Sequence, residues 1–373
     1  MSPSPAPLPP PPSSQQPSTS VSPSLVAPHV RRMSSEDITT ALLNSGSGTP
    51  EMQRHRRASF ASTVEDEEEV EAMLRSMGPN DWIPPSHVSA ELYTWGLDLY
   101  DCEGNPEREA HLGATPQELM ASAHALLESM NIRGALGVSA ETVQSFIIAC
   151  HQGYHPKPFH NFVHATYVLH GCVLTLQQSP TLMSLLGPVE RVALCIAALG
   201  HDIGHLGVQN PFLMNIDDPL ALMYNDQSVL ENMHTSRLFG VLRQKGCTLL
   251  DGLTREGYRA VRTMIIKIIA ATDLAGHFDE GTLWTKFKNR LNTLADKPFS
   301  SDSSADVTMA AGMVLHAADL SGPARPWKVS FAWSSKVQEE FVTQVEMEKQ
   351  MGAHLLLLHA YYRTHASSLC PLI

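Results

Sequence analysis

The chain has 373 residues, 43% of them hydrophobic, and a formal net charge of −12. This acidic balance argues against broad nucleic-acid binding, which depends on clustered Lys and Arg. No apolar run approaches the roughly 18 residues of a membrane span, and residues 1–5 lack the basic and apolar parts of a signal peptide. The six cysteines are dispersed, as is typical of buried thiols in a reducing compartment. We therefore expect a cytoplasmic protein.

Residues 1–80 are expected to form a disordered tail. Their first 30 residues contain ten prolines and eight serines and not one Asp, Glu, Lys or Arg. Such a segment has too few apolar side chains to offset the entropy of ordering it. A run of acidic residues follows at 65–69.

The tail contains two Arg-Arg-x-Ser motifs, which end at Ser34 and Ser59. They resemble sites for basophilic protein kinases, and phosphorylation there would add negative charge that can order or dock a segment. Short motifs of this kind also occur often in Ser-rich tails without function. Both interpretations stay open at this point.

From residue 81 the composition becomes that of a folded domain, and the periodic segments are helical. Apolar residues recur every three or four positions in 116–130 and in 258–274, and 189–199 is apolar nearly all round, as in a buried helix. No alternating pattern flanked by hairpin turns occurs. The sequence therefore predicts one compact, multi-helix, all-α domain over residues 81–352.

Three segments place imidazole or carboxylate groups beside apolar helical stretches. They span 160–164, 201–205 and 316–319, and the groups belong to His160, His164, His201, Asp202, His205, His316 and Asp319. Burying such groups costs several kcal/mol unless each has a partner, and a divalent cation is one. Each segment alone could be a structural accident. Together they follow the ligand order of the HD-type metallophosphohydrolases, and the absence of cysteine argues against a closed structural zinc site.

The motifs as a set resemble the catalytic domain of class I 3′,5′-cyclic nucleotide phosphodiesterases. The resemblance covers about residues 81–352 and rests on five segments. They are Phe-His-Asn-Phe-Val-His-Ala at 159–165, His-Asp-Ile-Gly-His-Leu-Gly-Val-Gln-Asn at 201–210, Leu-Ala-Leu-Met-Tyr-Asn-Asp-Gln-Ser-Val-Leu-Glu-Asn at 220–232, Ala-Thr-Asp at 271–273 and Ala-Asp-Leu-Ser at 318–321.

The resemblance implies a site with two divalent cations. The implied ligands of the first cation, which we expect to be zinc, are His164, His201, Asp202 and Asp319. Asp202 would also bridge to a second cation, magnesium or manganese, whose other ligands would be water. The substrate would be a cyclic nucleotide, opened to its 5′-monophosphate.

The resemblance also implies roles for residues around the cations. His160 would be the general acid that protonates the departing 3′ oxygen, and we expect Glu231 to orient it. His205 and Asn210 would belong to the same polar surroundings, and Phe159 would lie against the substrate.

The sequence departs from the family pattern in places. Gly204 and Gly322 stand where many members have aspartate and asparagine. Residues 353–373 do not match, and the glutamine and phenylalanine that hold the purine are absent from them. The choice between cyclic AMP and cyclic GMP therefore stays open. Two alternatives also stay open: a general HD-type phosphohydrolase, and a catalytically impaired regulatory form without the purine pocket.

Overall fold

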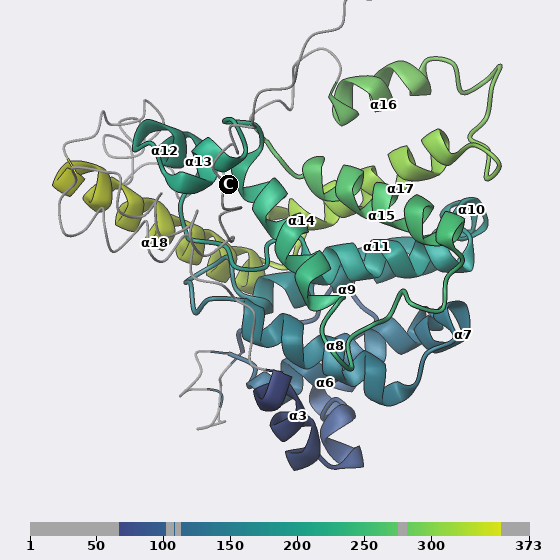
Figure 1. Ribbon diagram of the computed structural model, residues 1–373, viewed down its shortest axis with the longest axis horizontal. Helices are drawn as coiled ribbons and strands as arrows, with labels where there is room; N and C mark the ends of the chain where they lie inside the picture. Colours follow the sequence, from purple (N-terminus) through teal and green to yellow (C-terminus); the bar gives the residue numbers. More distant parts are fainter. Residues whose placement is uncertain (1–66, 102–107, 109–112, 275–281, 352–373) are drawn as a thin grey trace, which may run out of the picture.

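The computed structural model describes residues 67–101, 108, 113–274 and 282–351 (Figure 1). All regular structure in these residues is helical, so the all-α prediction is confirmed. The α-helices are α3 (Glu67–Ser76), α4 (Ser86–Glu91), α6 (Pro116–Ser129), α7 (Ile132–Leu136), α8 (Ala140–Gly153), α9 (Phe162–Gln178), α10 (Pro180–Leu185), α11 (Pro188–Gly200), α12 (Asn210–Asn215), α13 (Pro219–Met223), α14 (Val229–Val241), α15 (Arg255–Ala270), α16 (Leu283–Leu291), α17 (Ser304–Asp319) and α18 (Trp327–Met351). Two 3₁₀ turns, η1 (Pro79–Trp82) and η2 (Gly322–Ala324), precede α4 and α18.

Helix α9 lies at the centre of the fold and carries an almost continuous buried surface. Helices α11 and α17 pack against it, and α15 covers α11 and α17 (Figure 1). Helix α6 packs on α9 as well, with α8 beside it. Residues 192–200 of α11 are all buried, which explains why this segment is apolar nearly all round.

The helices expected from periodicity are present. The segment 116–130 is α6, and 189–199 is α11, whose first residue is Pro188. The segment expected at 258–274 is α15, which begins earlier because the hydroxyl of Thr254 accepts the Gly257 N–H as an N-cap. It also ends earlier, at Ala270, so that the Ala-Thr-Asp motif follows the helix.

The prediction that residues 1–80 are disordered is wrong for the last of them, from residue 67 onward. Helix α3 starts at Glu67 and buries Val70 against α8, and Met73 and Leu74 also pack on the core. These apolar residues have helical spacing, and the acidic run provides the negative charge that favours a helix N-terminus. The Lys245 ammonium, 3.0 Å from Glu71, joins the helix to the loop after α14. Ser34 and Ser59 lie outside the described residues, so their phosphorylation stays a prediction.

Four of the cysteines lie within the described residues, and all four are buried and form no disulfide, as expected: Cys150, Cys172, Cys195 and Cys247. Within those residues, no helix is both long and apolar enough to cross a membrane.

Candidate metal centre

The first expected ligand, His164, lies in the first turn of α9. Asn161 caps this helix: its side-chain oxygen accepts the N–H groups of Val163 and His164, and its amide nitrogen donates to the Lys157 carbonyl at 2.7 Å. The cap therefore fixes the start of α9 and the position of the His164 backbone in its first turn.

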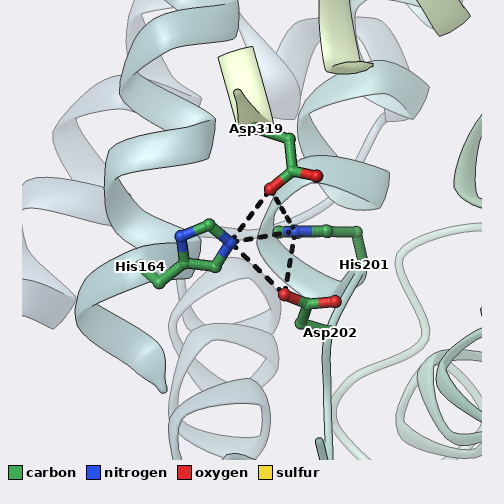
Figure 2. A group of neighbouring side chains, drawn as sticks. All are labelled: His164, His201, Asp202 and Asp319. Carbon is green, nitrogen blue, oxygen red and sulfur yellow. Dashed lines mark hydrogen bonds and ion pairs between the residues drawn. The ribbon is translucent and has the colours of Figure 1, made fainter. Parts of the chain in front are cut away.

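The other three expected ligands come from two helix ends. His201 and Asp202 follow α11 directly, and Asp319 is the last residue of α17. Figure 2 shows all four side chains pointing toward one another. His164 Nε2 lies 3.3 Å from His201 Nε2, 3.3 Å from Asp202 Oδ2 and 3.1 Å from Asp319 Oδ1. His201 Nε2 lies 3.2 Å from Asp202 Oδ2 and 3.4 Å from Asp319 Oδ1.

These separations fit a cation site. A tetrahedral site with bonds of about 2.0 Å has edges of about 3.3 Å, close to the five distances between the ligand atoms. His201 Nδ1 donates to the Ala198 carbonyl at 2.9 Å, which leaves the Nε2 lone pair directed at the cluster. Both histidines are buried, at 1% and 0% exposure for His164 and His201. Two buried imidazole nitrogens that face each other beside two carboxylates are best explained by a cation between them.

The two carboxylates are ionised. Burial opposes their ionisation, but the neighbouring His201 and His164 outweigh it, so that the pKa values of Asp202 and Asp319 are lowered. The donor set thus offers two anionic oxygens and two imidazole nitrogens, which suits zinc and other borderline divalent ions.

A second cluster shares Asp202 with the first. The ligand-type atoms of Asp202, His205 and His234 lie within 4.8 Å of one another. His234 Nε2 is 3.6 Å from Asp202 Oδ1, whereas Oδ2 of the same carboxylate faces His164 and His201. Asp202 therefore directs one oxygen to each cluster.

The two histidines of the second cluster are held in defined tautomers. His234 Nδ1 donates to the Ile203 carbonyl at 2.9 Å, so its Nε2 lone pair faces Asp202. Burial lowers the pKa of His234 to about 4, so the ring is neutral. His205 Nδ1 accepts the Gly207 N–H at 3.0 Å, which places the proton of the neutral ring on Nε2.

His160 lies beside both clusters, stacked on His205 with ring centroids 3.8 Å apart. Its Nδ1 is 2.5 Å from Glu340 Oε2. Burial disfavours the charged imidazolium, but the hydrogen bond and charge of Glu340, helped by Asp202 and Asp319, outweigh burial and raise the pKa of His160.

The expectation that Glu231 orients His160 is wrong, because the carboxylate on His160 belongs to Glu340 of α18. Glu231 instead accepts the Asn210 side-chain amide at 2.9 Å. Asn210 in turn accepts the Leu230 N–H at 2.8 Å, so the pair joins the start of α12 to α14. Burial, together with the nearby charge of Asp273, raises the pKa of Glu231 to about 7.

The clusters open onto a cavity of about 700 Å³ between α12, α14 and α18. His160, Asp202, His205, Glu231, His234 and Asp319 all line it. Phe159 lines it too, tilted over His164 at 4.6 Å between centroids. Its size is that of a small-molecule site.

Two site residues were missed from the sequence, Glu340 and His234. Both carried a signal. Trp333, Glu340, Gln344 and Glu348 recur at helical spacing and form a buried face of α18, and an acidic residue on a buried face needs a partner. His234 lies three residues after Glu231, so the two share a face of α14 that is turned toward the cavity.

The comparisons with known proteins agree with this geometry. Residues 159–368 match the family described as 3′5′-cyclic nucleotide phosphodiesterase. The match runs past Gly352, so the prediction that the resemblance ends at that residue is wrong. The matched residues that follow Gly352 lie outside the described part of the chain.

Two curated relatives are similar. The 3′,5′-cyclic-nucleotide phosphodiesterase regA of Dictyostelium discoideum is 33% identical over 228 residues, which are 61% of this chain and 28% of that protein. The probable 3′,5′-cyclic phosphodiesterase pde-1 of Caenorhabditis elegans is 31% identical over 274 residues, 72% of this chain and 38% of that protein. The chain thus spans about a third of the length of these relatives.

A solved structure has the same fold. The phosphodiesterase domain of the RhoPDE fusion protein from the choanoflagellate Salpingoeca rosetta superposes with a TM-score of 0.65 at 30% identity, over 73% of this chain and 80% of that one. The family match covers more than half of the chain, and the helices carry the metal-type ligands in the expected order. The chain therefore belongs to the 3′,5′-cyclic nucleotide phosphodiesterase family.

Proposed function

We propose that this chain hydrolyses 3′,5′-cyclic nucleotides to 5′-monophosphates at the cavity between α12, α14 and α18. The observation that carries the proposal is the carboxylate of Asp202, which turns one oxygen to His164 and His201 and the other to His234, beside His160. A pair of neighbouring cation sites with a histidine close by is suited to attack on a phosphodiester.

In this proposal His164, His201, Asp202 and Asp319 hold the first cation, zinc, and Asp202 shares the second, magnesium or manganese. When bound, the two cations lower the pKa of water and stabilise negative charge on the phosphoryl oxygens. They also make an acidic chain able to attract an anionic substrate.

His160 supplies the proton in the proposed reaction. Its Nδ1 is committed to Glu340, so Nε2 is the nitrogen that donates to the departing 3′ oxygen. The backbone N–H groups of Phe159 and His160 each donate to Glu340 Oε1 at 2.8 Å, which prevents the ring from turning away. A fixed donor avoids the loss of rotational freedom during the reaction.

The surrounding residues keep the cluster in place. Tyr154 accepts the backbone N–H of Asp202 at 3.2 Å and donates to the Leu199 carbonyl at 3.0 Å, so the turn that carries the shared carboxylate is held from α8. On the other side of the cavity, the pair of Asn210 and Glu231 holds the start of α12 against α14.

The test is product identification. Purified protein loaded with zinc and either magnesium or manganese is incubated with cyclic AMP and with cyclic GMP, and the products are separated by chromatography. We expect the 5′-monophosphate of at least one nucleotide. His160→Ala should abolish most turnover while the cation content is kept, whereas Asp319→Ala should lower both. His87→Ala, an exposed histidine on α4, is the matched control and should behave as wild type.

Two other results would contradict the proposal. Well-folded, cation-loaded protein that yields no 5′-monophosphate would show that the chain does not hydrolyse these cyclic nucleotides. Release of phosphate from simple monoesters, with no action on cyclic nucleotides, would point to a general phosphohydrolase instead.

A further inference from the structure

The turn over residues 200–205 contains two glycines, and side chains of α14 fill the space beside both of them. A Cβ atom added to Gly204 would lie 1.7 Å from Arg237 Nη1 and 2.7 Å from its Cζ. A Cβ atom added to Gly200 would lie 2.5 Å from Leu238 Cδ1. Two neighbouring side chains of α14 therefore occupy the positions that side chains at 200 and 204 would otherwise take.

The backbone at Gly204 is one that favours glycine. The His205 N–H donates to the Asp202 carbonyl at 2.9 Å, which closes a turn with Gly204 as its third residue. The φ angle of Gly204 is +74°, in the left-handed region. Because this residue has no side chain, the Arg237 guanidinium reaches the backbone of the turn.

The guanidinium forms a hydrogen bond with that backbone. Arg237 Nη1 donates to the Gly204 carbonyl at 3.1 Å. Three residues earlier on α14, His234 Nδ1 donates to the Ile203 carbonyl at 2.9 Å. Both central carbonyls of the turn are thus held by one helix, and a hydrogen bond from a charged donor is stronger than one between neutral groups.

These contacts join the two parts of the second cluster. Asp202 and His205 come from the turn, whereas His234 comes from α14. Asp202 Oδ1 lies 3.6 Å from His234 Nε2, so a small shift of the turn along α14 changes the spacing of the cluster. The Tyr154 hydroxyl holds the Asp202 backbone from α8, and Arg237 holds the far end of the same turn from α14.

We propose that Arg237 is a positioning residue for the second cation, because it holds the turn that carries Asp202 at a fixed spacing from His234. This rests on the proposed function, which assigns the second cation to the Asp202 carboxylate. Arg237 is not among the described residues that line the cavity, so it acts through the turn. Residues that hold metal ligands in place typically change the metal affinity by about 10- to 100-fold.

The experiment measures Mn²⁺ binding by calorimetry to the full chain loaded with zinc at the first site. Arg237→Met keeps the reach of the side chain but removes its charge and its hydrogen bond, and we expect the Kd for Mn²⁺ to rise about tenfold or more. Arg237→Lys keeps the charge and a donor and should recover part of that loss. Arg243→Met changes an exposed arginine just beyond α14 and is the matched control, with the Kd of wild type.

A second variant tests the contact from the side of the turn. Asparagine adopts the left-handed backbone more readily than most residues, so Gly204→Asn displaces the guanidinium with little backbone strain. We expect its Kd for Mn²⁺ to rise about as much as that of Arg237→Met. The double variant Gly204→Asn/Arg237→Met should lose no more than either single variant, because the same contact is removed only once. Losses that add in the double variant would overturn the role of Arg237.

Zinc content is measured on every variant by elemental analysis. The role is supported when Arg237→Met binds Mn²⁺ more weakly than wild type at unchanged zinc content. It is overturned when the two proteins bind Mn²⁺ equally. It is also overturned when Arg237→Met binds Mn²⁺ more tightly, which would mean that the guanidinium only repels the cation, or when zinc is lost together with Mn²⁺.

Mn²⁺ binding is measured without nucleotide, so its outcome is separate from that of the proposed function. Wild type that binds Mn²⁺ beside zinc but yields no 5′-monophosphate refutes the proposed function, and the Kd values still decide the role of Arg237. Wild type that binds no Mn²⁺ beside zinc overturns that role. If cyclic nucleotides are hydrolysed, the Mn²⁺ concentration for half-maximal activity should rise in Arg237→Met by the same factor as the Kd.

Discussion

The carboxylate of Glu340 forms hydrogen bonds with both the ring and the backbone of His160. Oε2 lies 2.5 Å from His160 Nδ1, and Oε1 accepts the His160 N–H at 2.8 Å. The two residues are 180 positions apart, so the contact joins the start of α9 to α18 in the lining of the cavity. Burial opposes ionisation of Glu340, but its hydrogen bonds and the charge of His160 lower its pKa.

The first prediction concerns this pair. Glu340→Gln keeps the size of the side chain but removes the negative charge that stabilises the imidazolium. We expect kcat to fall by about 10- to 100-fold, the range for losing a charge-assisted hydrogen bond, with cation content unchanged. The measurements are steady-state kinetics and elemental analysis. Glu339→Gln changes the exposed neighbour on the same helix and should leave kcat unaltered. A Glu340→Gln variant that keeps wild-type kcat, or that loses cations, would contradict the role given to Glu340.

The second prediction concerns cation stoichiometry. Asp202 turns one oxygen to each cluster, whereas Asp319 contacts the first cluster alone among the described residues. After dialysis against trace metal, Asp319→Asn should retain one cation fewer than wild type and Asp202→Asn two fewer, as counted by elemental analysis. Asp217→Asn is a suitable control, because Asp217 is exposed and its left-handed backbone is one that asparagine also adopts. Equal cation content in Asp202→Asn and Asp319→Asn would show that Asp202 is not shared.

The sequence located the four side chains that the structure brings together, but not the carboxylate that holds His160. His164, His201, Asp202 and Asp319 form recognisable motifs because a buried helix rarely carries such groups, and the structure brings all four together. Glu340 belongs to no comparable motif: its function depends on α18 crossing the start of α9, a contact between distant parts of the chain. Glu231 lies within a strong motif, but proximity in a motif does not decide which imidazole a carboxylate reaches.

The same distinction applies to the fold. Periodicity located α6, α11 and α15 because each has an apolar stripe or an apolar surface. It gave no reason to end α15 at Ala270, since the apolar pattern continues beyond that residue. Helix α3 was missed because its acidic first turn resembles a solvated tail, and only its contacts with α8 decide otherwise.

The third prediction concerns a buried hydroxyl behind the site. Tyr167 is fully buried on α9, and its hydroxyl accepts the backbone N–H of Leu99 at 2.6 Å. Tyr167→Phe leaves that buried N–H without an acceptor, so the free energy of unfolding should fall by about 1–3 kcal/mol. Urea denaturation followed by circular dichroism measures it. Tyr93→Phe removes an exposed hydroxyl that is 3.4 Å from the Ala125 carbonyl and should change stability by less than about 0.5 kcal/mol. Equal losses in the two variants would mean that the Leu99 contact contributes little.

The fourth prediction concerns stability against pH. His170 is buried, and its Nε2 lies 3.0 Å from the Thr94 carbonyl while Arg325 Nη1 lies 3.3 Å from its Nδ1. Burial and the Arg325 charge lower the pKa of His170 to about 3. The unfolded chain, with a histidine pKa of about 6.5, takes up the proton first as the pH falls. His170 therefore destabilises the fold progressively from about pH 6.5 down toward pH 3 and has no such effect at higher pH.

Replacing His170 by Gln removes this titration. Between pH 6 and pH 5 the free energy of unfolding of His170→Gln should fall less steeply than that of wild type, by about 1 kcal/mol per pH unit. Urea titrations at several pH values give the slopes, and His87→Gln, which changes an exposed histidine, serves as the reference. Parallel slopes for wild type and His170→Gln would show that His170 does not titrate between the folded and unfolded states as described.

Helix α3 also determines where the catalytic region can be separated from the residues before it. A fragment cut at residue 81, the boundary that composition alone favours, would remove Val70 and its apolar neighbours and uncover the surface of α8 that they protect. Such a fragment would expose an apolar strip that favours aggregation, and it would lose the ion pair between Glu71 and Lys245. A fragment cut at Glu67 keeps that strip covered and is the better choice for expression and crystallisation.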